Sequence, residues 1–599
     1  MPKILSQSIL WCFWTILAVG HADWLAAQNL DKATLLQGVG SIPLPGESDA
    51  LCTTVTINAL PEIILTAEID PDNLDQSFQI IAVSSSRLGK GKVLVFSTPA
   101  YFRKPLVQEV EVQKLLTNCL QWGSSARRKR VQVWGGDEAL TTFITQQART
   151  KLVGTTAVLD PSADILFLSQ ELTDTATISR IEGFVRQGGT LLFGSPLPDL
   201  QKVKQQGLAE TRFNQLLCKA GLLQTNYVAV RYPHRTFLSA GLVPSYLGIK
   251  NILKSIGTTV YQPPSPMQGG YIFTYTLERA LAMNPVDSPI SKHLRQATHY
   301  WPDSLLVPTG EKPVMMGVTG GASTYLVQHA LLKNKLRDQP NPAYVAPAAA
   351  TFPGAVPATA ARISTALVLP VRVGKNGMRY PAPGSRLAHS TGLYVPAGEK
   401  AIIYLTANDS LRQLQAQVGV HSDDLINLPR FTREAFDLTR RFDLQRGRNE
   451  VYSPYGGLLL LNIPDTTSLL ALRIKVQGAV QAPRFERGKT SLAEWQKTIR
   501  QYPAPWAELA SDNISLTVPA ARIRTLDDPE KLLAFWDAAL NTVGKLAGLT
   551  TSRRHPERII VDQQVAFGSM FTDTDRIVVP NDSTCGHMLD ADFMWKNGS

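Results

Sequence analysis

The hydrophobic period changes twice along this 599-residue chain, and these changes limit the folds that it can adopt. Between residues 30 and 215, short apolar runs alternate with amphipathic helical segments. The period is mostly helical from 216 to 345, and from 362 to 482 short apolar runs are separated by Gly and Pro. Each pattern is typical of a different class of domain. A chain of this length is too long to form a single hydrophobic core, so the sequence predicts about three to five domains of roughly 100–200 residues each.

The first region predicts a doubly wound α/β domain over residues 30–215. The expected strands are Phe78–Val83, Val93–Ser97, Asp164–Leu168 and Thr190–Gly194, and the expected helices are Val110–Trp122 and Thr175–Gln187. Ser97 is followed by Thr98 and Pro99, so no Cys nucleophile stands after this strand, and no histidine lies between Asp23 and His234. Because a Cys nucleophile needs a histidine to activate it and neither such a Cys nor a histidine is present here, we expect this domain to be catalytically silent.

The middle of the chain is predicted to connect the domains. Residues 216–345 read as a mostly helical connector, with helices expected at Phe213–Ala220, Tyr271–Met283 and Ser323–Leu336. His293 and His299 are six residues apart, which does not put both on one helical face, so they are not predicted to be a metal pair. Residues 346–361 are rich in Ala and Pro and are predicted to be a linker.

The second half of the chain predicts a β-sandwich over residues 362–482, followed by the start of an α+β domain over residues 483–599. The expected strands of the sandwich are Ala366–Leu369, Ala401–Leu405, Leu414–Val420 and Leu458–Ile463. In the α+β domain, residues 505–513 are predicted to be a polar turn that leads into a half-buried strand at Ile514–Val518. A helix is expected to begin at Pro529, after Asp527 and Asp528.

The N-terminus predicts a secretory signal peptide over residues 1–22. Lys3 precedes an apolar stretch from Ile9 to Val19, and small residues precede a cleavage site between Ala22 and Asp23. The alternative is an uncleaved membrane anchor, although the stretch is shorter than the ~20 residues that a span needs. The sequence therefore predicts a secreted or cell-surface protein without a stable membrane span.

The net charge of +11 and the pI near 9.3 are mild for this length. The densest basic run is Arg127-Arg128-Lys129-Arg130, which is interpreted as a solvated turn, with an anionic partner as the alternative. No aromatic residues interleave with the run, so nucleic-acid binding is not predicted.

The cysteines are few and widely spaced. Outside the predicted signal peptide the chain has Cys52, Cys119, Cys218 and Cys585, without a CxxC pair. The spacing is that of neither a zinc ribbon nor a disulfide scaffold, and a single Cys52–Cys119 bridge is one possible pairing.

Several segments resemble the enhancin-like M-sixty zinc metallopeptidases, which are gluzincins, and the related TRP-channel-associated factors, whose domain order is similar. The family-motif residues that carry this resemblance are Ser390, Thr391, Gly392, Leu393, Tyr394, His421, Asp423, Asp424, Gly456, Gly457, Trp506, Glu508, Asp512 and Asn513. Arg558–Asp562 is also similar to a strand of the family's catalytic domain. Upstream, Arg87–Phe96 and Phe184–Leu192 resemble the class I glutamine-amidotransferase-like domain that precedes some M-sixty regions.

The resemblance implies a zinc site built on His-Glu-x-x-His, because two histidines four residues apart share a helical face and the Glu polarises the attacking water. The nine histidines of this chain include no pair four residues apart, and none is followed by Glu. We therefore assign no catalytic or metal-binding residue within residues 1–599, and zinc is expected only for a full-length relative. His421 with Asp423 and Asp424 could suggest a metal site, but one His and two adjacent carboxylates make an incomplete zinc shell, which favours a structural hydrogen-bonded turn.

The resemblance thus favours an exported M-sixty metallopeptidase acting on glycoproteins such as mucins, present here in a form that ends before its catalytic helix. A gene-model fragment, a truncation or a natural loss would each produce such a form. One alternative is a non-catalytic regulatory or binding protein like the TRP-channel-associated factors. Another is a carbohydrate-binding surface protein that uses only the β-sandwich.

Overall fold

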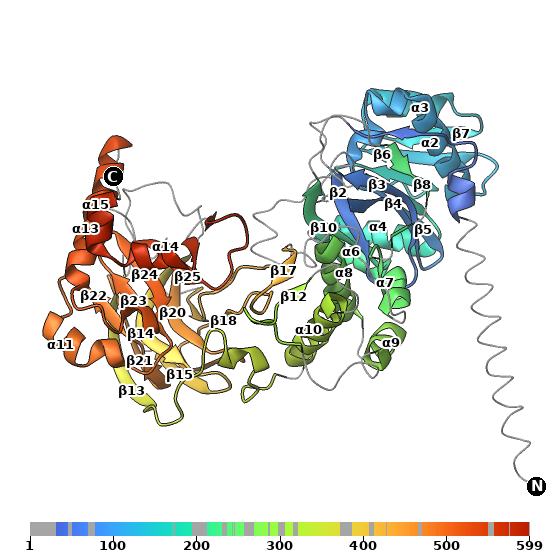
Figure 1. The fold of residues 1–599 in the computed structure, drawn as a ribbon. Coiled ribbons are helices and arrows are strands. Elements are labelled where there is room, and N and C mark those ends of the chain that lie inside the picture. Colours follow the sequence, from blue (N-terminus) through green and yellow to red (C-terminus); the bar gives the residue numbers. More distant parts are fainter. Residues whose placement is uncertain are drawn as a thin grey trace, which may run out of the picture. The chain divides into compact units, whose positions relative to one another are not determined.

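A computed structural model of the protein, drawn in Figure 1, describes residues 31–45, 51–69, 78–170, 172, 174–194, 212–229, 237–241, 243–244, 246–256, 269–284, 288–297, 306–315, 321–338, 340–371, 386–405, 413–426, 428–464, 470–548, 556–573 and 576–597. The predicted signal peptide, with its cleavage site at Ala22 and Asp23, lies outside these residues. The chain divides into two compact units. Unit 1 is Met1–Asp303 with Met316–Asn334, and unit 2 is Ser304–Met315 with Lys335–Ser599.

Unit 1 is built on a nine-stranded mixed sheet with the strand order β1-β11-β3-β4-β5-β9-β8-β6-β7. The strands from β5 to β7 in this order are parallel, and those from β1 to β5 are antiparallel. The bounds are β1 Ile42–Pro43, β3 Glu62–Ile69, β4 Phe78–Leu88, β5 Gly91–Phe96, β6 Lys129–Trp134, β7 Thr150–Gly154, β8 Ile165–Leu168, β9 Thr190–Gly194 and β11 Phe237–Ser239. The helices among these strands are η1 Pro99–Phe102, η2 Leu106–Gln108, α2 Val110–Gly123, α3 Glu138–Gln146, α4 Thr175–Gln187 and α6 Arg212–Lys219. Unit 1 therefore has the mixed α/β character that the alternating pattern predicts.

The basic run belongs to this sheet and is not wholly a turn. Lys129 and Arg130 begin β6, and the guanidinium of Arg130 lies 2.8 Å from a carboxylate oxygen of Asp164. The interpretation as a solvated turn is thus wrong for the second half of the run, because the strand's apolar residues follow the basic ones without a break.

The region predicted to be a mostly helical connector also contains strands. Its helices are α7 Ile249–Ile256, α8 Gly269–Met283, α9 Pro289–Ala297 and α10 Gly321–Asp338. Two strands extend unit 1, however: β11 lies between β1 and β3 in the large sheet, and β10 (Leu222–Ala229) pairs with β2 (Leu51–Thr56). These strands come late in the sequence and pair with early ones, so a pattern read along the chain does not place them.

Unit 2 contains an eight-stranded antiparallel sheet over the region predicted to be a β-sandwich. The strand order is β18-β16-β20-β14-β21-β15-β19, and β13 also pairs with β21. β21 pairs with β13 along most of its length, with β15 over Ile474–Gln477 and with β14 at Val480 and Gln481, so it joins the two parts of the sheet. The bounds are β13 Ile363–Pro370, β14 Arg386–Val395, β15 Lys400–Leu405, β16 Gln415–Val418, β18 Arg440–Asp443, β19 Gly447–Tyr452, β20 Gly457–Pro464 and β21 Ala471–Gln481. A separate two-stranded pair joins β12 (Val314–Met315) to β17 (Arg430–Phe431).

A six-stranded sheet follows in the same unit, with the order β22-β23-β24-β25-β27-β26. Its strands are β22 Arg484–Glu486, β23 Trp506–Ala510, β24 Ile514–Pro519, β25 Glu557–Asp562, β26 Phe571–Asp573 and β27 Arg576–Pro580. The helices are α11 Leu492–Lys497, α12 Ala520–Ile523, α13 Pro529–Leu546, α14 Ser583–Met588 and α15 Ala591–Asn597, together with η6 Ile499–Gln501. The stretch predicted to be a polar turn is in part a strand: β23 is fully buried and forms a hairpin with β24 around Ser511–Asn513.

The Ala/Pro-rich segment over residues 346–361 is not an exposed linker. It contains η4 (Pro347–Ala350), whose Ala348 and Ala349 are buried. Phe352 is 7% exposed and belongs to the core beneath the six-stranded sheet. The carbonyl of Pro353 accepts a 2.8 Å hydrogen bond from the indole of Trp506. Small and aromatic side chains in the first half of this segment pack against unit 2, and composition alone does not distinguish such a segment from a linker.

Two further features bear on the predictions. Cys119 is buried and carries a free thiol, so the Cys52–Cys119 bridge is wrong. Among the described residues, no helix combines the length and the apolar character that a membrane crossing requires.

Candidate functional site

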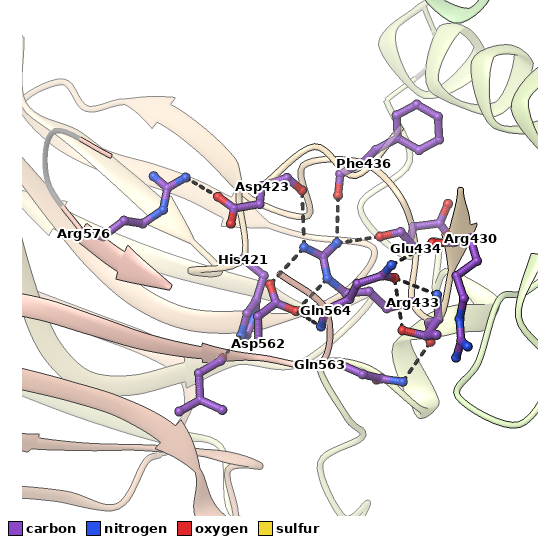
Figure 2. A network of polar contacts seen from close by, with 12 residues as sticks. His421, Asp423, Arg430, Arg433, Glu434, Phe436, Asp562, Gln563, Gln564 and Arg576 are labelled. Carbon is purple, nitrogen blue, oxygen red and sulfur yellow. Dashed lines mark hydrogen bonds and ion pairs between the residues drawn. The ribbon is translucent and has the colours of Figure 1, made fainter. Parts of the chain in front are cut away.

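Some of the motif residues of unit 2 belong to two polar clusters, and Figure 2 shows the first of them around Arg433. The side chain of Arg433 is completely buried. Its Nε and Nη2 donate to the two carboxylate oxygens of Asp562 at 2.7 and 2.9 Å. Nη1 donates to the carbonyls of Glu434 and Phe436, and Nη2 also donates to the carbonyl of Asp423. The guanidinium is therefore fully used in tying the loop after β16 to the end of β25.

Asp423 and Gln564 extend this cluster on either side. The carboxylate of Asp423, 3% exposed, pairs with Arg576 at the start of β27. The Gln564 side chain accepts from the backbone and hydroxyl of Thr432 and donates to the carbonyl of Arg430 (Figure 2). These contacts fix the loop that follows β25.

His421 is a neutral, buried part of the same cluster. Its ring packs at 4.6 Å from the ring of Phe352 and 4.3 Å from that of Trp506. Nε2 lies 3.1 Å from the carbonyl of Val561, so this nitrogen carries the proton and donates it. Burial lowers the pKa of His421 to about 4, against the opposing charge of Asp562. The imidazole therefore stays uncharged at neutral pH.

The second cluster is built around Glu508 on β23. Its side chain is 4% exposed, and one carboxylate oxygen accepts from Ser390, Ser515 and Arg558. Burial alone would raise the pKa of Glu508, but the charges of Arg558 and Arg484 and the serine hydroxyls lower it below its ordinary value. Arg558 also donates to the carbonyl of Ala388 at 3.3 Å. Glu508 is thus a buried carboxylate anion that joins β14 to β23, β24 and β25.

The other motif residues shape the backbone around these clusters. The Thr391 hydroxyl donates to the Leu459 carbonyl at 2.6 Å, where the β14–β20 register shifts. Gly392, Gly456 and Gly457 have positive φ angles of 71°, 71° and 152°.

The remaining motif side chains lie in the core or in turns. Leu393 and Tyr394 are buried. The Asp424 carboxylate accepts from the amide of Ile426, and the Asn513 side chain donates to Asp537. Asp512 is exposed in the β23–β24 turn.

Sequence reasoning did not find Arg433, which completes the first cluster. Arg558 and Asp562 stand at the two ends of a segment selected for its resemblance, but no role was assigned to either. The apolar run between Arg558 and Asp562 is a usable signal, since a charged residue at each end of a buried strand needs a partner. Arg433 lies in a loop without a periodic pattern, so nothing local marks it.

A zinc ion does not fit the residues present. In the described part of the chain, no three His, Cys, Asp or Glu side chains gather as metal ligands do. Nε2 of His421 already donates to the Val561 carbonyl, and both carboxylate oxygens of the nearby Asp562 accept hydrogen bonds from Arg433. Zinc sites need at least three protein ligands.

The two clusters connect two adjacent regions of the chain that match different family models. Residues 383–477 match the N-terminal domain of M60-like peptidases, and residues 478–599 match peptidase M60, enhancin and enhancin-like. The predicted resemblance to the M60 metallopeptidases and to the channel-associated factors is confirmed.

Among curated proteins, human TRPM8 channel-associated factor 1 is 26% identical over 560 residues, covering 90% of this chain and 56% of the relative. The Xenopus laevis TRPM8 channel-associated factor homolog is 39% identical over 188 residues, which are 31% of this chain and 21% of the relative. The chain thus spans about half the length of the human relative. Among solved structures, IMPa from Pseudomonas aeruginosa in complex with an O-glycopeptide aligns over 92% of this chain and 68% of its own, at 15% identity and a TM-score of 0.48.

Proposed function

We propose that residues 383–599 form the leading part of an exported M60-type zinc metallopeptidase that acts on glycoproteins such as mucins. The observation that carries this proposal is the order of the two family domains, one directly after the other, in a single compact unit. The glycoprotein substrate, the zinc and the export come from the family resemblance and from the predicted signal peptide. The Arg433–Asp562 pair has a structural role in this unit, because it fixes the end of β25 and the loop that follows it.

Zinc analysis and a cleavage assay test this proposal. We expect the 599-residue chain, purified and dialysed, to hold no stoichiometric zinc and to leave mucin and casein intact. The gene product read past residue 599 is expected to contain a His-Glu-x-x-His helix, to bind about one zinc and to cleave mucin in a chelator-sensitive way. A gene product without this motif and without cleavage would overturn the proposal.

The second candidate function is that of a non-catalytic regulatory or binding protein. The alignment with human TRPM8 channel-associated factor 1 favours it, since it runs over both units of this chain. Export discriminates between the two candidates, because a signal peptide cleaved before Asp23 places the mature chain outside the cytosol. N-terminal mass spectrometry of protein from the native host gives the answer: an intact Met1 in a cytosolic fraction favours the regulator.

We further propose that unit 1 carries a class I amidotransferase-like domain that serves as a scaffold. After β5, Ser97 is fully buried and the hydroxyl of Thr98 accepts from the amide of Ala100. Burial raises the pKa of the Cys119 thiol far above its ordinary value and that of Cys218 to about 12, so neither is a ready thiolate. Steady ammonia release from glutamine that is lost in Cys119→Ala or Cys218→Ala would contradict this role.

A further inference from the structure

A cavity of about 230 Å³ opens beside the second cluster, where the two M60 domains meet in unit 2. Its apolar wall is formed by Val368, Leu369 and Pro370 at the end of β13, together with Leu387 and Ala388 of β14. Its polar lining comes from Arg386, His389 and Ser390 of β14 and from the strands and turns of the six-stranded sheet. The cavity is of the size that a single sugar, amino acid or similar small molecule needs. The residues that line this cavity take no part in the contacts between the Arg433 loop and β25.

The charged side chains that line the cavity carry an excess of positive charge. Four are cationic and two are anionic: Arg386, Arg484, Lys489, Arg558, Glu486 and Glu508. The buried carboxylate of Glu508 is offset by Arg558 at 3.1 Å. Glu486 is offset by Lys489 and by Arg484, whose Nη2 lies 3.2 Å from it. Two positive charges therefore remain without a balancing carboxylate among the lining residues.

Arg484 also presents a donor that the protein leaves unused. Its Nε is buried and has no hydrogen-bond partner among the described residues. A guanidinium N–H without an acceptor is unfavourable. Because the Arg484 side chain is 28% exposed as a whole, a small rotation of it presents this N–H to a ligand oxygen. Arg386 also lines the cavity, and its Nε donates to the carbonyl of Gln413 at 2.9 Å. Planar guanidinium groups favour carboxylate and phosphate oxygens.

We propose that this cavity binds a small ligand through a carboxylate or phosphate group, with Arg484 and Arg386 as the anion-binding side chains. The apolar wall around Val368 and Leu369 contacts the body of the ligand. Glu508 holds the architecture of the pocket through Arg558, Ser390 and Ser515. The ligand is therefore a small anion with one carboxylate or one phosphate group, of about the size of one sugar or amino acid, and its binding does not depend on zinc or on peptide cleavage.

Isothermal titration calorimetry on the full chain tests this inference with four probes: glucuronate, glucose 6-phosphate, inorganic phosphate and neutral glucose. We expect saturable binding of glucuronate or glucose 6-phosphate with Kd below about 1 mM at low salt, and weakening as salt rises. Neutral glucose is expected not to bind. A preference between the two charged sugars identifies a carboxylate or a phosphate as the recognised group, and inorganic phosphate reports whether the anion alone suffices.

Matched variants assign the binding to this cavity. Arg484→Gln is expected to weaken the charged probe by about tenfold or more, and Arg386→Gln by a smaller factor. Arg473→Gln, an exposed arginine on β21 that does not line the cavity, is the control and should leave Kd unchanged. Thermal unfolding of each variant without ligand shows whether it is folded. If Arg484→Gln does not fold, Arg386→Gln alone tests whether the charged probe binds in this cavity. Equal binding of glucose, no binding of any probe at about 10 mM, or a Kd that neither variant changes would overturn the proposal.

Discussion

At the scale of single residues, His421 is expected to make unit 2 sensitive to acid. Its pKa is lowered from 6.5 to about 4 because burial disfavours the charged ring, so the unfolded chain binds a proton more readily than the folded one. The stability that depends on a neutral His421 is thus complete above pH 6.5 and is lost as the pH falls towards 4, up to roughly 3 kcal/mol. Urea unfolding of the wild type and His421→Gln between pH 7 and pH 4 measures it.

The variant His421→Gln keeps a side-chain donor for the Val561 carbonyl but cannot be protonated. We expect the wild type to lose more stability than this variant over the stated range. His389→Gln, which changes an imidazole outside the Arg433 cluster, is the control and should follow the wild type. Parallel pH profiles for the wild type and His421→Gln would show that the imidazole is not the titrating group.

The Arg433–Asp562 pair is the second residue-scale prediction. Removing one partner leaves a buried charge alone, so Arg433→Met and Asp562→Leu are each expected to destabilise unit 2 by about 3–5 kcal/mol. The double variant leaves no buried charge and is expected to recover at least about half of that loss. A double-mutant cycle from urea unfolding gives the coupling. Arg441→Gln, which breaks an exposed pair with Asp437, serves as the control and should change stability by less than about 0.5 kcal/mol.

At the scale of elements, the glycine that begins β20 is expected to be irreplaceable. Gly457 has φ 152°, and a Cβ there would overlap the backbone of Gly419, which is hydrogen-bonded to the next residue of β20. Gly457→Ala is therefore expected to destabilise unit 2 by more than about 3 kcal/mol or to prevent folding. Gly447→Ala is the matched change: φ is 94°, but no described atom lies within 4 Å of the added Cβ. It should cost only about 1–2 kcal/mol. Equal melting temperatures for the two variants would contradict this prediction.

The same scale shows what the sequence could predict. The helix at Thr175–Gln187 has its predicted bounds because the signals are local: Asp174 caps the amide of Thr177, and Gly188 ends the helix at φ 124°. Apolar strands such as β8 and β9 are similarly marked by their composition.

The predictions that were wrong share one cause: the segments concerned are held in place by contacts with residues far away in the sequence. β23 was predicted to be part of a polar turn because Ser511, Asp512 and Asn513 are turn formers. Its Glu508 can be buried only because it has partners on β14, β24 and β25. Phe352 was assigned to a linker because its neighbours are Ala and Pro, and only the rings of His421 and Trp506 make it a core residue. In the candidate site, the motif residues were found from resemblance, while Arg433 depends on a contact 129 residues away.

At the scale of the whole molecule, the two M60 domains behave as one body. A single buried core contains Tyr394 and Leu458 from the first domain together with Leu509 and Leu516 from the second. Both polar clusters cross the same boundary. A change on either side is therefore expected to act on both, since both domains contribute side chains to this core.

Unit 2 is predicted to fold without unit 1, provided that its short early segment is kept. Residues 304–315 belong to this unit, and β12 pairs Val314 with Phe431 and Met315 with Arg430, next to the Arg433 cluster. A chain that joins residues 304–315 to 335–599 through about 15–20 Gly and Ser residues should therefore unfold cooperatively and keep the acid sensitivity of His421. A chain of residues 335–599 alone leaves β17 without its partner strand and should be less stable by about 1–2 kcal/mol. Urea unfolding of both chains at pH 7 and pH 5 tests this prediction. Equal stability of the two chains would show that β12 does not support the Arg433 cluster. Failure of the joined chain to fold would show that unit 2 depends on unit 1.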